Sequence, residues 1–186
     1  MSRTWPLLVY VGLVLALFVR FRDPSTVRRP LHLVAAPEHL RLVRRYHRVF
    51  YAVLLAAPIE WLLRGRPDGW VLGPGAGLFF AGLIGYRKAG GALGEQLTPL
   101  VAPCEPAMLV QGGPYRRLRH PMYLAELAMA GGAPLTLGAY ATLVLAGAFA
   151  LVVGQRIVIE ERLLSERLPG YRAYAERTYR LFPYVY

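Results

Sequence analysis

Residues 113–123 read GPYRRLRHPMY, and the organisation of the chain can be followed outward from this stretch. A Gly-Pro turn opens it, three arginines follow, and His120 stands directly before Pro121. Proline is well tolerated at the first position of a helix, so we expect a helix to begin here and to include the apolar residues Met122–Leu137. The pattern predicts an imidazole and several guanidinium groups at the mouth of an apolar helix, where they could hold an anion or a polar cofactor.

The composition indicates an all-α, polytopic membrane protein. Of the 186 residues, 55% are hydrophobic, and the mean hydropathy is +0.35, whereas about 45–50% apolar residues is usual in soluble domains. The excess lies in five segments that approach the roughly 20 residues needed to cross a bilayer. These segments are Trp5–Phe21, Tyr46–Leu63, Trp70–Tyr86, Pro121–Leu137 and Ala139–Ile159. We expect about five transmembrane helices in one membrane domain, residues 1–186, the last two forming a C-terminal hairpin around Thr136–Gly138.

The basic residues are distributed as in a membrane protein rather than in a nucleic-acid-binding domain. The net charge is +11, but 19 of the 22 Lys and Arg residues fall in Arg20–Arg48, Arg87–Arg119 and Arg156–Arg180. If the N-terminus lies outside, five helices place all three segments in the cytoplasm, as the positive-inside rule requires. We therefore expect no nucleic-acid partner, an N-terminus outside and a C-terminus inside.

Two further features of the composition bear on source and chemistry. Arginine outnumbers lysine 21 to 1, which favours a GC-rich bacterial genome and hence the bacterial cytoplasmic membrane. Cys104 is the only cysteine, so we expect neither a disulfide framework nor a cysteine-based metal site. We expect no metal.

Several shorter segments carry local predictions. We expect Trp5 and Tyr10 to lie toward the outer interface, Glu38–Arg48 to form a separate interfacial helix, and Arg87–Ala107 to form a polar, glycine-rich loop. A closing helix is predicted over Tyr171–Tyr179.

The second and third apolar segments each contain a feature with two interpretations. Glu60 can pair with Arg64 at i,i+4 spacing near a helix end, although a carboxylate in an apolar segment can also be functional. Residues 73–77 read GPGAG, with glycines spaced as in part of a nucleotide-binding loop. Such a loop needs a preceding strand and βαβ units, which this sequence does not predict. We therefore interpret the glycines as contacts for close helix packing.

The predicted hairpin brings the start of the fourth apolar helix and the end of the fifth to one membrane face. The residues expected to meet there are Arg119, His120, Tyr123, Arg156, Glu160 and Glu161. Because successive residues of an α-helix are about 100° apart, the two glutamates should serve different partners.

These motifs resemble the isoprenylcysteine carboxyl methyltransferase family, part of a wider membrane group with the phospholipid N-methyltransferases. The resemblance rests on GPYRRLRHPMY, on RIVIEERLL at residues 156–164 and on YRAYAERTYRLFP at residues 171–183. It implies a methyltransferase core over residues 84–186 and a variable part, residues 1–83, that depends on substrate. Leu168-Pro169-Gly170 departs from the Phe-Gly usual after the paired glutamates. Glu126, inside the fourth apolar segment, is not general to the family. A glutamate at this place resembles a bacterial branch that methylates long-chain polyketide lipids such as alkylresorcinols.

The resemblance implies S-adenosyl-L-methionine as the cofactor at the cytoplasmic face, with a lipophilic acceptor arriving from the membrane. The residues it implies around the cofactor are Tyr115, Arg119, His120, Pro121, Tyr123, Glu160, Glu161, Leu164 and Tyr174, with Arg180 in the closing segment. We expect Glu161→Gln to abolish turnover with the fold intact.

The chemistry of the acceptor decides which residues are catalytic. A carboxylate needs no base, only an arginine to orient it, and Arg180 or Arg156 is the candidate. A phenolic hydroxyl must lose a proton, and His120 or Glu126 is then the candidate base. For Glu126 a packing role is the alternative. The expected partners are a lipophilic small-molecule or prenylated substrate and membrane lipids.

Three other functions are compatible with part of the pattern. A sterol-type membrane reductase that uses NADPH shares the His-Pro-x-Tyr segment and the closing Tyr…Arg…Pro pattern, but a glutamate pair suits a cationic donor better. A phospholipid N-methyltransferase would use the same cofactor. A transporter is the third, although no inverted repeat is evident.

Overall fold

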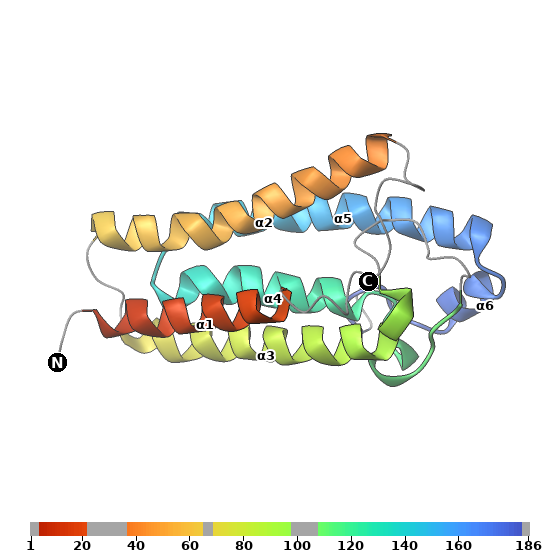
Figure 1. Cartoon of the computed structure of the whole chain (residues 1–186), viewed down its shortest axis with the longest axis horizontal. Helices are drawn as coiled ribbons and strands as arrows, with labels where there is room; N and C mark the ends of the chain where they lie inside the picture. Colours follow the sequence, from red (N-terminus) through yellow and green to blue (C-terminus); the bar gives the residue numbers. More distant parts are fainter. Residues whose placement is uncertain (1–3, 22–36, 65–68, 98–107, 184–186) are drawn as a thin grey trace.

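The computed structural model describes residues 4–21, 37–64, 69–97 and 108–183, which fold into a bundle of helices (Figure 1). The long helices are α1 (Trp5–Phe21), α2 (Pro37–Arg64), α3 (Gly69–Leu93), α4 (Pro121–Thr136) and α5 (Thr142–Arg167). The short ones are η2 (Gly94–Gln96), η3 (Gly113–Arg116) and α6 (Tyr171–Glu176). The described ranges contain no strand beyond an isolated backbone bridge between Leu118 and Tyr179. The all-α prediction is confirmed.

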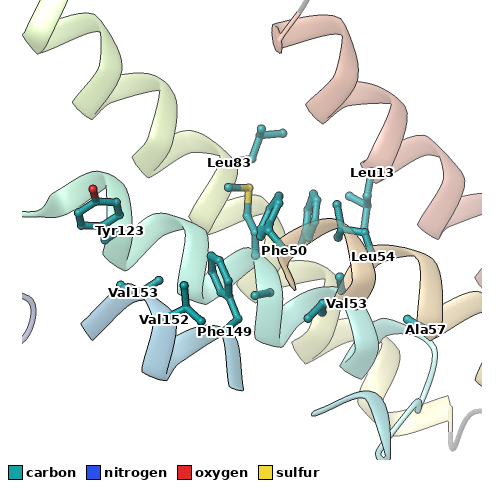
Figure 2. Packing of buried hydrophobic residues seen from close by; sticks show 14 of the residues in the cluster. Leu13, Phe50, Val53, Leu54, Ala57, Leu83, Tyr123, Phe149, Val152 and Val153 are labelled. Atoms are coloured by element: carbon teal, nitrogen blue, oxygen red, sulfur yellow. The ribbon is translucent and has the colours of Figure 1, made fainter. Parts of the chain in front are cut away.

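A single hydrophobic core joins the five long helices. Figure 2 shows Leu13 of α1, Phe50 of α2, Leu83 of α3 and Phe149 of α5 in this core, and Met129 of α4 belongs to it as well. Each large apolar side chain removed from water stabilises a fold by about 1.5–3 kcal/mol. Helix packing in lipid depends instead on the close fit of such side chains. The core fixes the relative positions of α2, α4 and α5, which carry the site.

Glycines bring α3 and α4 into close contact. A Cβ added to Gly75 would lie 2.3 Å from the backbone nitrogen of Thr136, and one added to Gly132 would lie 2.5 Å from that of Phe79. The close-packing interpretation is confirmed for Gly75, whereas the glycines two residues to either side meet nothing within 4 Å. The nucleotide-loop alternative is wrong because this segment lies inside a helix.

The predicted hairpin of α4 and α5 is confirmed, and α2 supports its turn. Gly138 has a φ of +64°, which glycine adopts without strain. The carboxylate of Glu60 accepts hydrogen bonds from the backbone N–H groups of Ala141 and Thr142 at 2.9 and 2.7 Å. It thereby caps the start of α5, whose first N–H groups have no partner within the helix. The predicted pair with Arg64 is also present, at 3.6 Å.

The first two helices differ from their predicted form. α2 begins at Pro37 and runs unbroken, so the prediction of a separate helix over Glu38–Arg48 is wrong; proline at the first helical position is compatible with this start. Tyr10 is 3% exposed and donates a short hydrogen bond to the carbonyl of Leu54, so it packs inside the bundle, and its depth toward the outer interface stays a prediction. A buried phenol needs such a partner. The side chain of Trp5 lies outside the described set.

Two predicted boundaries are corrected. α3 continues to Leu93, into the segment predicted as a loop, because small residues such as the fully buried Ala89 pack there. Residues 98–107 of that predicted loop lie outside the described ranges. α6 ends at Glu176 rather than at Tyr179, because the residues that follow pair through their backbone with the segment before α4.

The outer surface suits a membrane. Among the described helices, one is long and apolar enough to cross a bilayer by composition, Thr142–Arg167, with a mean hydropathy of 2.0 in its most apolar window. Large apolar side chains also face outward elsewhere, including Leu8, Leu63 and Trp70, which are 68, 82 and 74% exposed. Exposed apolar side chains of this size are compatible with contact with lipid. The expected number of five crossings stays a prediction.

Figure 1 shows the starts of α2 and α4 and the ends of α3 and α5 at the end of the bundle that carries α6. Apart from the end of α1, the described parts of the three arginine-rich segments therefore lie toward this end. The positive-inside rule requires basic segments on the same side of a membrane. The motif of residues 113–123 lies at this end as well.

Candidate functional site

The carboxylate of Glu161 is the centre of the site, because two guanidinium groups and an imidazole meet on it. Arg119 Nε donates to Oε1 at 2.7 Å and Arg180 Nε donates to Oε2 at 2.8 Å. His120 Nε2 lies 3.3 Å from Oε1. The side chains of Glu161 and Arg119 are 13% and 11% exposed, so water screens this pair less than a surface pair. The predicted meeting of residues 119–120 with Glu161 is confirmed.

Backbone pairing holds the two cationic segments together. His120 donates its backbone N–H to the carbonyl of Arg180 at 3.1 Å, and Arg119 donates its own to Tyr179 at 2.8 Å. The guanidinium of Arg119 also donates to the carbonyl of Ala175 in α6 at 2.6 Å. The segment before α4 and the segment after α6 therefore form one unit around the central carboxylate.

Glu160 contacts a different set of partners, as the helix geometry predicts. Its Oε2 accepts a hydrogen bond of 2.5 Å from the hydroxyl of Tyr123, which in turn accepts one of 2.6 Å from Arg156 Nε. The ring of His120 stacks on that of Tyr123 with centroids 5.5 Å apart, linking this group to the Glu161 centre. Within the described part of the chain, Oε1 of Glu160 accepts no hydrogen bond. This oxygen can therefore accept a hydrogen bond from a bound ligand.

Glu126 lies about one turn further along α4 and belongs to a second buried group. Tyr46 of α2 donates a short hydrogen bond to its Oε2. The guanidinium of Arg156 lies over two tyrosine rings, 4.6 Å from the centroid of Tyr46 and 5.6 Å from that of Tyr123. The exposures of Tyr46, Glu126 and Arg156 are 4, 8 and 4%. Arg156 thus links the pair of Tyr46 and Glu126 to Tyr123, the partner of Glu160.

Tyr46 was absent from the predicted site. Its partner Glu126 is 80 residues away in sequence, so no local spacing predicts that contact. A hydroxyl-bearing residue at the start of an apolar span was the one available signal, because a buried hydroxyl must find a partner.

Four predicted residues support the site from outside its ionic groups. The hydroxyl of Tyr174 donates to the carbonyl of Tyr115 at 2.7 Å. Burial raises the pKa of Tyr174 to about 12 and raises that of Tyr115 further, so both phenols stay protonated in the physiological range. Leu164 packs against the small apolar cluster at α6, and the buried Pro121 begins α4. These contacts position the segments that carry the charged groups.

Comparison with known proteins assigns this arrangement to a family. Residues 71–169 match the phospholipid methyltransferase family, a range that includes both glutamates and the segment before α4. The chain belongs to the phospholipid methyltransferase family. Membership of this family of membrane methyltransferases favours methyl transfer over NADPH-dependent reduction as the activity. Tyr174 and Arg180 lie beyond the matched range.

Two proteins that are similar to this chain are named for metal resistance. The nickel-cobalt-cadmium resistance protein NccN of Alcaligenes xylosoxydans xylosoxydans is 30% identical over 156 residues, which are 81% of this chain and 71% of that protein. The cobalt-zinc-cadmium resistance protein CzcN of Cupriavidus metallidurans is 41% identical over 76 residues, 40% of this chain and 35% of that protein. The first similarity covers more than two thirds of both chains, so it extends beyond the residues that match the family.

Proposed function

We propose that this protein is an S-adenosylmethionine-dependent membrane methyltransferase that acts on a lipophilic acceptor. The observation that carries the proposal is the junction of the two α5 glutamates with Arg119, His120 and Tyr123 at the mouth of α4. Membership of a methyltransferase family supports it. When bound, S-adenosylmethionine supplies a methyl group on a sulfonium centre.

The side chains at this end of the bundle fit such a donor, which carries an ammonium, a carboxylate and ribose hydroxyls. Glu160 keeps an oxygen that can accept from an ammonium or a hydroxyl, whereas both oxygens of Glu161 already accept from arginines. We assign the binding of S-adenosylmethionine to Glu160 and the positioning of the arginine and histidine side chains to Glu161. His120 is also a positioning residue here, because its Nε2 faces Glu161.

The acceptor in this proposal bears a carboxylate or a hydroxyl on a lipophilic body. Arg180, whose side chain is 35% exposed, is the residue proposed to orient a carboxylate; Arg156, at 4% exposed, is buried behind Tyr123. Glu126, held by Tyr46, is the proposed base for a hydroxyl, since buried membrane carboxylates are costly and mark functional sites. Positioning and exclusion of water supply the rest of the catalysis.

Calorimetric titration of the detergent-purified protein with S-adenosylmethionine, and separately with NADPH, tests the proposal. We expect the wild type to bind S-adenosylmethionine and Glu160→Gln to bind it about tenfold or more weakly, since a hydrogen bond to a charged group contributes about 1.5–3 kcal/mol. The control is Glu166→Gln on the same helix, because Glu166 is exposed and lies 3.1 Å from Arg162. Binding of NADPH in place of S-adenosylmethionine would contradict the proposal. Transfer of labelled methyl to carboxylate or phenolic lipids then identifies the acceptor.

A further inference from the structure

Two tyrosines of α6 have nearly the same environment but different hydroxyl partners. Tyr171 and Tyr174 are each 3% exposed, and their ring centroids lie 5.9 Å apart. The hydroxyl of Tyr174 donates to the carbonyl of Tyr115 at 2.7 Å and lies 3.2 Å from that of Leu118. The hydroxyl of Tyr171 is buried and has no hydrogen-bond partner in the part of the chain that the structure describes.

An unpaired buried hydroxyl is uncommon in a folded protein, because it loses its bonds to water and gains none in return. Packing accounts for the ring of Tyr171, which belongs to the small apolar cluster with Leu168 and Tyr174. It does not account for the oxygen, since phenylalanine would pack equally well. Among the described residues nothing uses this oxygen, and it is available to a bound ligand.

The surroundings of Tyr171 are those of the candidate site. Burial raises the pKa of Tyr171, and the charge of Glu161 raises it further. The phenol therefore stays protonated and can donate. The carboxylate of Glu161 accepts from Arg119 and Arg180, and the hydroxyl of Tyr171 makes no hydrogen bond to it, so this hydroxyl is available to a bound ligand.

We propose that the Tyr171 hydroxyl binds the methyl donor, donating to one of its oxygen atoms in the carboxylate or the ribose. This inference rests on the proposed function and exchanges the roles suggested by the resemblance: Tyr171 contacts the cofactor, and Tyr174 holds α6 against the segment before α4. Tyr171 contributes to affinity for the donor, and Tyr174 contributes to stability.

The test compares Tyr171→Phe with Tyr174→Phe, because both substitutions keep the ring and remove only the oxygen. Detergent-purified protein is titrated with S-adenosylmethionine by calorimetry, and thermal unfolding is followed without ligand. We expect Tyr171→Phe to raise the Kd about tenfold and to leave the Tm unchanged or slightly raised, because it removes a ligand contact and an unpaired buried hydroxyl. We expect Tyr174→Phe to lower the Tm by roughly 3–6 °C, since it leaves the buried carbonyl of Tyr115 without its donor.

The outcomes distinguish a failure of the assignment of Tyr171 from a failure of the proposed function. An unchanged Kd for Tyr171→Phe, with normal binding by the wild type, contradicts the assignment of Tyr171 and leaves the proposed function standing. A lowered Tm for Tyr171→Phe shows that the hydroxyl has a structural partner and also overturns the assignment. If the wild type does not bind S-adenosylmethionine, the proposed function is wrong and the assignment of Tyr171 falls with it.

Discussion

Glu160 and Glu161 are neighbours in the sequence, yet their carboxylates have different hydrogen-bond partners. Glu161 accepts hydrogen bonds from Arg119 and Arg180 and lies beside His120, so its charge is used within the protein. Glu160 accepts one hydrogen bond, from Tyr123. The difference follows from the angle of about 100° between successive residues of a helix, which turns one side chain toward the closing segment and the other toward α4.

Glu161→Gln should therefore impair both activity and stability, which revises the expectation of an intact fold. The amide keeps the shape but removes the charge that holds two arginines. We expect the free energy of unfolding to fall by about 2–3 kcal/mol and methyl transfer to fall about 100-fold or more, because the site loses its geometry. Thermal unfolding and transfer of labelled methyl measure the two effects.

The matched control for this substitution is Glu166→Gln, five residues further along α5. Its side chain is 51% exposed and its partner Arg162 is 82% exposed, so we expect a change within about 0.5 kcal/mol. Equal effects of the two substitutions would show that Glu161 does not organise the site.

At the scale of elements, the spacing of α3 and α4 depends on glycine. The backbones approach so closely at Gly75 and Gly132 that a single methyl group has no room. This contact fixes the position of α4, and the start of α4 carries His120 and Tyr123. A packing feature in the third apolar segment is thus linked to the geometry of the site.

Gly75→Ala is expected to destabilise the protein, whereas Gly77→Ala is not. The Cβ of the first would meet the backbone of Thr136 at 2.3 Å, and that of the second meets nothing within 4 Å. We expect a loss of about 1–3 kcal/mol or more for Gly75→Ala from overpacking. For Gly77→Ala we expect no loss, or a gain of about 0.5 kcal/mol from helix propensity. Thermal unfolding in detergent compares the pair, and equal Tm values would argue against the close contact.

At the scale of the whole molecule, the two ends of the bundle differ in charge. The candidate site, α6 and the arginine-rich starts of α2 and α4 share one end, and the turn between α4 and α5 lies at the other (Figure 1). Basic segments are retained on the cytoplasmic side of a membrane. This polarity predicts that the site faces the cytoplasm, where S-adenosylmethionine is available to it.

Reporter fusions test this orientation in bacterial cells. We expect a fluorescent protein fused after Tyr186 to fluoresce and alkaline phosphatase fused there to be inactive, because the phosphatase folds only outside the cytoplasm. Phosphatase fused after Ala139, in the α4–α5 connection, should be active. The reverse pattern would show that the site faces outward.

Local patterns in the sequence were sufficient for several features of this fold. Apolar runs and prolines predicted the bounds of α1 and the start of α4, and the tight turn predicted the hairpin. The meeting of residues 119–123 with residues 156–161 followed, because two antiparallel helices joined by a short turn must bring these ends together.

The sequence by itself thus determined the order of the long helices, the hairpin and the group of residues at its open end, but not the full extent of α2, α3 and α6. Only the tertiary structure decided that Tyr46 reaches Glu126, that Glu60 caps α5, and that the hydroxyls of Tyr171 and Tyr174 have different partners. These contacts depend on how far each helix is rotated and shifted against its neighbours. Rotation and shift are set by the fit of side chains across the whole core, and no local spacing specifies them.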